Sequence, residues 1–444
     1  MELLKQIPQV DKLTSDDFFI GLNQSLLNKI ARDKIEILRE DILSGRVEKT
    51  DNYALKEAIK REYEQLLSSS LKPLINATGV ILHTNMGRSL ISKEVLEKAS
   101  KVICNYSNLE YNQDKGCRGE RYGHVSKHLK TLLDVEDVLV VNNNAAAVFL
   151  ILNTFAKEKE VVVSRGELVE IGGSFRIPDV MRQSGAVLHE VGATNKTKLE
   201  DYSNAISDNT SILMKVHQSN FSIEGFSADV DFEDIQRLAS QHNLLDYYDL
   251  GSGYVVSLPY SLSNSEHPLC EILKKSPSLI SFSGDKLFGS VQAGIIVGKK
   301  EFIDTLKKNQ LLRMLRVDKI TLSILEETLK AYLEEQYDLI PTLKMLFSDT
   351  EVLRQRALKM QSSLKTESCE VIDSITVMGG GTLPNREFPS IALHIKGKAS
   401  SLERAFRKKG VIGRIEEDRF LLDIRTVLED NEVELLEIIN EIVK

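Results

Sequence analysis

The chain contains no tryptophan and only four cysteines among its 444 residues. The cysteines stand at positions 104, 117, 270 and 369, form no CxxC pair and lie near no second group of metal-ligating residues. This spacing argues against a structural zinc site and a disulfide framework, so we expect free thiols and no metal. No run of about 18 apolar residues is present, and charge follows within two residues of the first methionine, which argues against a membrane span and a secretory signal. We therefore expect a cytoplasmic protein with no membrane partner.

The sequence also lacks an excess of positive charge. Its formal net charge is −8, which argues mildly against indiscriminate binding to nucleic acid but leaves room for a local basic patch. Hydrophobic residues make up 42% and charged residues 27% of the chain, as is usual for a globular protein. A chain of this length predicts about three domains with a large core.

The pattern of apolar and polar residues changes twice along the chain. Residues 1–66 carry apolar residues at helical spacing, and three serines at 68–70 mark a boundary, so we expect an N-terminal helical domain. Over residues 67–335, β-branched runs alternate with helix-like stretches, which predicts an α/β domain with a mostly parallel seven-stranded sheet. The expected strands are Val138–Val141, Val161–Val163, Val187–Val191, Ile212–Val216, Leu244–Leu250, Leu279–Phe282 and Ile295–Val297. Helices are expected at 145–157, 175–184, 231–242 and 266–275.

The C-terminal part of the chain, residues 336–444, predicts a smaller α+β domain. A long helical pattern leads into it from Lys319 to Met345, with a kink or break expected at Pro341. The segments expected as strands are Ser390–Ile395 and Phe420–Ile424, and those expected as helices are Leu402–Lys409 and Glu432–Ile442.

A lysine follows directly after one of the buried strands. Residues 281–286 read Ser-Phe-Ser-Gly-Asp-Lys, and an ammonium group is costly to bury unless it is paired or loses its charge. A Schiff base with an aldehyde cofactor makes Lys286 part of the chemistry, with Ser283 beside the same cofactor. The simpler alternative is a strand-end lysine that reaches solvent. An Asn-Ala turn and then Asp249 precede Lys286, in the order that favours a pyridoxal phosphate enzyme.

Two upstream motifs carry the other groups that such a cofactor needs. In Asn142-Asn-Asn-Ala-Ala-Ala147 a β run stops and a helix starts, so we expect the backbone N–H groups of Asn144, Ala145 and Ala146 to bind phosphate. A plain asparagine N-cap is the alternative. Asp249 stands where a strand ends, a place where ligands gather in open α/β sheets, and its carboxylate can keep a pyridinium nitrogen protonated. A turn or cap role is the alternative there.

Further polar residues complete the candidate site. His217 is expected to stack on or hydrogen-bond the cofactor, and Asn220 to bind its phenolic oxygen, with a structural histidine as the alternative. Four arginines are expected to hold a phosphate-like oxyanion, since guanidinium forks suit such groups: Arg88, Arg121, Arg313 and Arg316. Solvated surface arginines are the alternative. Arg313 and Arg316 stand three apart among leucines, so on a helix they share one face, which argues against that alternative.

Taken together, these motifs resemble bacterial selenocysteine synthase, the L-seryl-tRNA(Sec) selenium transferase family of fold-type I pyridoxal phosphate enzymes. The motifs that carry the resemblance are Ile75–Arg88, Asn142–Ala147, Ser164–Asp179, His217–Asn220, Asp249–Gly253, Ser283–Lys286, Leu311–Lys319 and Gly379–Pro384. They occur in the expected order and span nearly the whole chain.

The resemblance implies a site and a set of partners. The cofactor lysine falls on Lys286, and the selenium-donor arginines fall on the four arginines named above. The helical domain over residues 1–66 would engage tRNA, although this domain is not rich in positive charge. Within it we take Lys29, Arg32, Arg39 and Lys60 as candidate phosphate contacts, with solvated helix faces as the alternative. A homodecamer built as a ring of dimers is implied by resemblance only.

The reaction implied is the conversion of seryl-tRNA(Sec) to selenocysteinyl-tRNA(Sec). Lys286 removes the Cα proton of the seryl group, the serine hydroxyl is eliminated, and selenium from selenophosphate is added at Cβ. One alternative is a related pyridoxal phosphate lyase or aldolase that acts on a small phosphorylated amino compound, with the arginines on the substrate's own phosphate. Another is a tRNA-binding protein that has lost catalysis, against which Lys286 and Asp249 argue.

Overall fold

The computed structural model describes residues 3–171, 175–218, 221, 223, 225–262 and 268–443. The chain divides into two compact units, Met1–Pro73 and Leu74–Lys444, and each is described by itself. Within the described residues, none of the helices is long and apolar enough to cross a membrane.

The N-terminal unit is a small helical body with a core of its own. Its helices are α1 (Val10–Thr14), α2 (Gln24–Leu43) and α3 (Asn52–Leu67). Asn23 caps α2 and Asp51 caps α3, each by accepting a hydrogen bond from the first turn of its helix. Leu27 and Ile30 of α2 pack against Ile59 of α3, as the helical spacing of the apolar residues predicts.

A seven-stranded sheet is the centre of the second unit. In spatial order its strands are β4 (Asp137–Val141), β12 (Gly294–Gly298), β11 (Leu279–Ser283), β10 (Leu245–Gly251), β9 (Thr210–Val216), β5 (Glu160–Ser164) and β8 (Val187–Val191). Neighbours from β11 to β8 pair in parallel, and β12 runs antiparallel to both β11 and β4. The predicted α/β class and mostly parallel sheet are confirmed, and each of the seven predicted strands forms.

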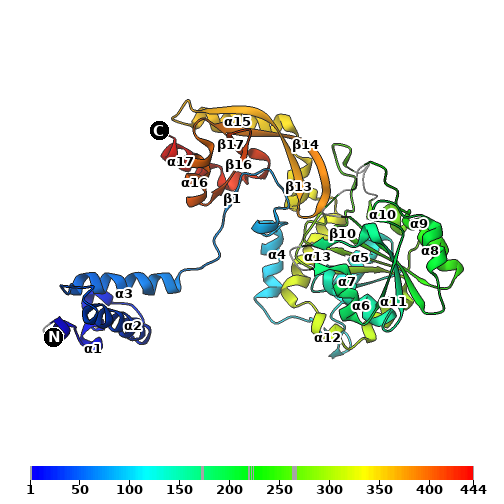
Figure 1. Cartoon of the computed structure of the whole chain (residues 1–444), viewed down its shortest axis with the longest axis horizontal. Helices are drawn as coiled ribbons and strands as arrows, with labels where there is room; N and C mark the ends of the chain where they lie inside the picture. The colour runs from blue at the N-terminus through cyan, green and yellow to red at the C-terminus, as the bar shows by residue number, and fades with distance from the viewer. Residues whose placement is uncertain are drawn as a thin grey trace. The chain divides into compact units, whose positions relative to one another are not determined.

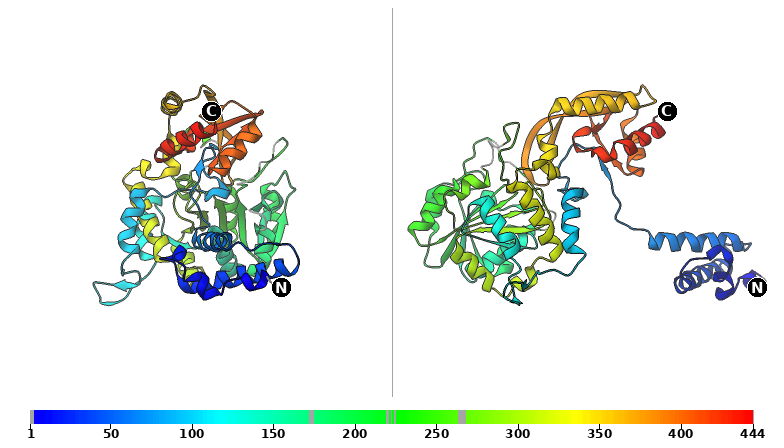
Figure 2. Two further views of the ribbon diagram at one scale, coloured as in Figure 1. Left: turned by 90° about the vertical axis from the view of Figure 1, so that its left-hand side faces the viewer. Right: turned by 180° about the vertical axis from the view of Figure 1, so that it is seen from behind.

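Helices cover both faces of this sheet because its strands are apolar on both sides. In β4, Val138 and Val140 pack into one cluster while Leu139 and Val141 pack into the other. The first cluster includes α5 (Gly123–Leu133), α9 (Phe232–Gln241), α10 (Leu269–Leu273) and α13 (Lys319–Leu333). The second includes α6 (Asn144–Phe155), α7 (Ile177–Ser184) and α11 (Lys300–Lys308). Figure 1 labels these helices, and Figure 2 shows the sheet between them from two further directions.

A second, antiparallel sheet forms towards the C-terminus. Its strands are β13 (Cys369–Gly379), β14 (Thr382–Ile395), β17 (Arg419–Asp423) and β16 (Arg414–Glu416), and Figure 1 shows β13 and β14 as a long curved hairpin. The helices of this region are α15 (Thr350–Ser363), α16 (Ala399–Lys408) and α17 (Glu432–Ile442). The sequence predicted α16, α17, β17 and the end of β14, but β13 was not predicted.

The helix expected from Lys319 to Met345 is two helices. The first, α13, ends at Leu333, and Glu335 adopts a φ of +55°, which ends helical geometry there. The second, α14 (Pro341–Phe347), begins at Pro341, because the fixed φ of proline suits the first helical position. The predicted break at Pro341 is therefore wrong in place, since the chain leaves the helix before the proline.

Candidate active site

Lys286 lies in a buried turn at the end of β11. Its residue is only 5% exposed, and the residues from Ser281 to Ser290 are all buried. Hydrogen bonds close the turn, since Gly284 N–H donates to Ala293 O at 2.8 Å and Gly289 N–H donates to Lys286 O at 2.8 Å. A Cβ at Gly284 would lie 2.6 Å from Val291 O, so glycine is required there. The turn therefore holds the Lys286 backbone in one place.

Asp249 lies on the neighbouring strand and is also buried. It is the Cα partner of Ser281 in the pairing of β10 with β11, and it accepts a hydrogen bond from Asn144 Nδ2 on Oδ1 at 2.7 Å. Burial raises the pKa of Asp249 to about 6, although the hydrogen bond from Asn144 and the charge of Lys286 each lower it. The effect of burial therefore outweighs that of these partners, as expected of a buried carboxylate that receives a further donor.

Asp246 of the same strand has a different role. It accepts hydrogen bonds from Ser278 N–H at 2.9 Å and from Ser278 Oγ at 2.6 Å, which fixes the start of β11. Of the two carboxylates on this strand, Asp249 is therefore the one that contacts Asn144.

The start of α6 supplies backbone N–H groups near Asp249. Asn143 is the N-cap, and its side chain accepts from Ala146 N–H at 2.9 Å, so one of the three expected phosphate donors is already engaged. The N–H groups of Asn144 and Ala145 have no acceptor within the described part of the chain. A Cβ at Gly294 would lie 2.1 Å from Asn143 O. β12 therefore approaches this turn so closely that only glycine fits at position 294.

These residues fit pyridoxal phosphate. The carbonyl oxygen Oδ1 of Asn144 is buried and, among the described residues, has no hydrogen-bond partner, which indicates a site built for a group that completes it. Asp249 suits the pyridinium N–H, the open amides of Asn144 and Ala145 suit the phosphate, and Lys286 suits the aldehyde carbon.

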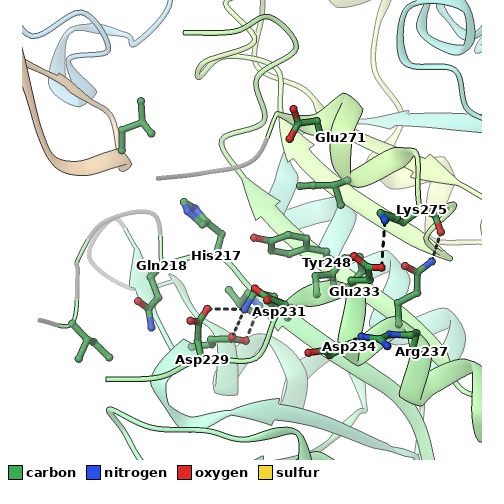
Figure 3. Close-up of a pocket in the computed structure, with 18 of the residues that line it drawn as sticks. His217, Gln218, Asp229, Asp231, Glu233, Asp234, Arg237, Tyr248, Glu271 and Lys275 are labelled. Carbon is green, nitrogen blue, oxygen red and sulfur yellow. Dashed lines mark hydrogen bonds and ion pairs between the residues drawn. The ribbon is translucent and has the colours of Figure 1, made fainter. Parts of the chain in front are cut away.

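His217 lies beside the same strand ends. Its backbone N–H donates to Asp249 O at 2.9 Å, which continues the pairing of β9 with β10. A cavity of about 880 Å³ opens from here towards α9, and Figure 3 shows His217, Gln218 and Tyr248 along it. The Nε2 amide of Gln218 donates to Gly166 O at 2.8 Å. Asn220, the other predicted residue of this motif, lies outside the described residues.

An ion cluster that lines this cavity was not predicted, with Lys215 and Glu167 buried and Asp229 exposed. Lys215 Nζ lies 3.4 Å from Glu167 Oε1 and 3.0 Å from Asp229 Oδ2, and Glu167 Oε2 accepts from Val216 N–H at 2.9 Å. Burial alone would lower the pKa of Lys215, but the charges of Glu167 and Asp229 outweigh it and raise that pKa. The cluster fixes the end of β9 just before His217. A lysine inside the apolar run Ile212–Val216 was its signal in the sequence.

Arg88 is the predicted arginine that lies next to the Lys286 turn. Its Nη1 donates to Asp285 Oδ2 at 2.9 Å, and Ser89 N–H donates to Asp285 O at 3.3 Å. Arg88 has a φ of +62° directly after Gly87 at +94°, a conformation that is strained for a residue with a side chain. Such strain is typical of functional sites, and Asp285 is a partner that the sequence did not reveal.

The other three predicted arginines lie together. Arg121, Arg313 and Arg316 line a groove of about 770 Å³. Glu110 accepts from Arg121 Nε at 2.9 Å and from Arg316 Nη1 at 3.4 Å, and the hydrogen bond from Arg121 together with nearby arginine charges lowers the pKa of Glu110. Glu110 stands in a loop without a motif, so no signal in the sequence could have found it.

This groove, called the arginine groove below, adjoins the C-terminal end of β4. This end lies nearest to Asn144 and Asp249 and is called the cofactor end below. Asn142 N–H donates to Leu315 O at 3.0 Å, and Val141 forms an isolated antiparallel bridge with Arg316. Asn142 is two residues from Asn144, which contacts Asp249. The structure therefore connects the arginine groove to the Lys286 site through one strand end.

Comparison with solved structures supports this reading of the fold. The structure of a D-glucosaminate-6-phosphate ammonia-lyase matches with a TM-score of 0.61 and 20% identity, covering 86% of this chain and 97% of that one. The likeness shows the fold alone. Together with the sheet order described above, it shows that the two chains share one fold.

Comparison with sequences defines the family. The family model described as L-seryl-tRNA selenium transferase matches residues 74–428. Relatives named L-seryl-tRNA(Sec) selenium transferase from Aliarcobacter butzleri (strain RM4018) and Sulfurimonas denitrificans (strain ATCC 33889 / DSM 1251) are each 56% identical over 446 residues, covering 100% of this chain and 99% of the relative. The chain belongs to the L-seryl-tRNA selenium transferase family, as the resemblance of its motifs predicted.

Proposed function

We propose that this protein converts seryl-tRNA(Sec) to selenocysteinyl-tRNA(Sec) with pyridoxal phosphate, by eliminating the serine hydroxyl and adding selenium from selenophosphate. The observation that carries the proposal is the Lys286–Asp249–Asn144 site in a chain 56% identical, over its whole length, to relatives that bear this name. Identity over 100% of the chain includes the N-terminal unit, for which a lyase acting on a small molecule has no evident use.

Each residue of the site takes a role that its position permits. Lys286 binds the cofactor and then moves the proton at the Cα atom of the seryl group, as a general base within a buried turn. Asp249, hydrogen-bonded by Asn144, holds the ring nitrogen in its protonated form. When bound, pyridoxal phosphate supplies an electron sink for the negative charge that develops at Cα. Burial of the turn keeps water away from this proton transfer.

The direct test is to incubate the purified protein with seryl-tRNA(Sec) and selenophosphate and to identify the amino acid esterified to the tRNA. Selenocysteine is the expected product. Unchanged serine on tRNA, combined with turnover of a small phosphorylated amino compound, would instead favour the lyase or aldolase.

The arginine groove is proposed to bind the selenium donor. Replacing Arg313 or Arg316 with alanine is expected to raise the KM for selenophosphate about tenfold, because one charge-assisted hydrogen bond to an anion contributes roughly 1.5–3 kcal/mol. The absorbance of the bound cofactor should not change. Arg407→Ala is a matched control, since Arg407 is exposed on α16 and pairs with Glu403 at 2.6 Å. An unchanged KM for selenophosphate in both groove variants would show that these arginines do not bind the donor and have a structural role.

The N-terminal unit is proposed to bind tRNA separately from the chemistry. It has its own core, and on α2 the exposed residues Lys29 and Arg32 stand three apart, so they share a face, with no ion-pair partner in the described residues. Two other candidates are partly engaged, since Arg39 pairs with Glu36 at 3.4 Å and Lys60 lies 5.2 Å from the Phe18 ring centroid. This leaves Lys29 and Arg32 as the stronger phosphate contacts.

A chain that begins at Leu71 is expected to fold and to bind pyridoxal phosphate, because the seven-stranded sheet and its helices lie beyond this point. Its affinity for seryl-tRNA(Sec) should fall at least tenfold, as measured by filter binding at one stated salt concentration. The full-length Lys29→Ala/Arg32→Ala variant should show part of this loss. Equal tRNA affinity in the full-length and shortened chains would contradict the assignment.

Three finer statements are also part of the proposal. We take residues 67–335 and 336–444 as the catalytic and C-terminal domains, and a homodecameric ring of dimers as the assembly, the latter by family resemblance. Light scattering of the purified protein would test the assembly. The cytoplasm is the compartment that the sequence predicts.

A further inference from the structure

The arginine groove is larger than one small anion requires. Its volume of about 770 Å³ lies within the range of roughly 300–1,000 Å³ that is typical of pockets for larger organic ligands, whereas a tetrahedral oxyanion has five heavy atoms. It runs along β4, the edge strand of the sheet, from Arg316 at Val141 to Asp137 at the other end. At about 3.3 Å per residue, this strand is roughly 13 Å long.

The groove is strongly basic in a chain that is acidic overall. Eight of its nineteen lining residues are Lys or Arg and three are Asp or Glu, which leaves a formal charge of +5, against −8 for the whole chain. Its arginines lie at the cofactor end. Its lysines come from the two helices that flank β4, with Lys127 and Lys130 on α5 and Lys307 and Lys308 in the last turn of α11.

The four lysines are not equivalent. Lys307 Nζ lies 2.6 Å from Asp137 Oδ2, and Lys130 Nζ lies 4.0 Å from Asp137 Oδ1, so these two share one carboxylate. Lys127 and Lys308 are exposed and have no ion-pair partner within the described ranges. They therefore add positive charge to the groove that no ion pair within the described residues balances.

We propose that the lysine half of the groove binds phosphates of the 3′-terminal nucleotides of the tRNA substrate, with Lys127 and Lys308 as the contacts. This inference rests on the proposed function. The seryl ester at the 3′ end of the tRNA must reach Lys286, so the nucleotides that precede this end must pass along the protein surface away from Lys286. The groove starts at the cofactor end of β4 and follows the edge of the sheet outward. Phosphates of one nucleic acid strand are about 3.4 Å apart along a helix axis and further apart when extended, so its length suits two to four of them.

The test uses the full-length protein with its cofactor and a short RNA hairpin that carries only the acceptor arm and the single-stranded 3′ end of the tRNA. Lys127→Ala/Lys308→Ala should weaken binding of this hairpin about tenfold. It should also reduce the magnitude of the slope of log affinity against log salt by about 1.4, since each contact with a single-stranded phosphate contributes about 0.7. The matched control is Lys359→Ala/Lys408→Ala, which removes two exposed lysines from α15 and α16.

Two results would overturn the inference alone: the same affinity and salt slope in the groove variant as in the control, or equally tight binding of an acidic peptide of equal charge to the wild-type groove. Failure of the proposed function looks different, since the wild-type protein would then bind neither the hairpin nor whole seryl-tRNA(Sec). The cofactor absorbance of the groove variant should equal that of the wild type, which shows that the double substitution leaves the fold intact.

Discussion

Replacing Lys286 with alanine is expected to lower the rate of selenocysteinyl-tRNA formation at least a thousandfold, or about 4 kcal/mol in transition-state stabilisation. The side chain is proposed both to bind the cofactor and to move the Cα proton, so one substitution removes two functions. The turn from Gly284 to Phe288 is buried, is closed by its own hydrogen bonds and contains no second lysine. The measurement is single-turnover product formation at saturating seryl-tRNA(Sec) and selenophosphate.

Borohydride reduction followed by peptide mapping identifies the lysine directly. The label should fall on the peptide that contains Lys286. Lys215 is an internal control, since it is also buried, but Glu167 and Asp229 keep it in the ammonium form, which is not nucleophilic. Lys286→Arg is the matched variant, because it keeps a positive charge near Asp249 and should take up no label. A label on another lysine, or near-normal turnover in Lys286→Ala, would refute the assignment.

Six of the seven strands of the main sheet could be predicted because they are largely buried on both faces, whereas the edge strand β8 is mostly exposed or half-buried. In the sequence, such buried strands are short continuous runs of apolar residues, as in Val138–Val141. This pattern can be recognised from neighbouring residues alone. β13 was missed because most of its residues are half-buried or exposed and two are charged, so the strand depends on its pairing with β14. The break after Leu333 was misplaced because no proline or glycine marks it.

The candidate site could be predicted in part, for the same physical reason. Lys286 and Asn144 each follow a strand and Asp249 lies near the end of one, and strands that run in the same direction bring such ends to one edge of the sheet. Their partners could not be found in this way. Asn144 was expected to bind phosphate through its backbone, yet its side chain bonds Asp249, a contact that joins residues 105 apart in sequence. Glu110 and Asp285 likewise meet their arginines only through tertiary structure.

Replacing Asp249 with asparagine is expected to reduce turnover roughly a hundredfold to a thousandfold while some cofactor still binds. A neutral amide cannot balance the charge of a protonated ring nitrogen, so the step that places negative charge on Cα slows. Single-turnover kinetics with seryl-tRNA(Sec) measure this effect, and Asp246→Asn is the matched control, since Asp246 lies on the same strand but bonds Ser278. Turnover near the wild-type value in Asp249→Asn would show that another group pairs with the ring.

The same substitution should stabilise the cofactor-free protein. Because burial raises the pKa of Asp249 from 3.8 to about 6, the folded wild type binds this proton more tightly than the unfolded chain does. The stability contributed by the proton is complete below pH 3.8 and is lost as the pH rises through 6, a total of about 3 kcal/mol. Asparagine does not titrate, so the stability advantage of Asp249→Asn should grow by about 1.4 kcal/mol between pH 5 and pH 8, as measured by urea denaturation of both cofactor-free proteins. A difference that stays constant with pH would show that Asp249 is ionised throughout this range, and the buried carboxylate would then need a cation other than the bound cofactor.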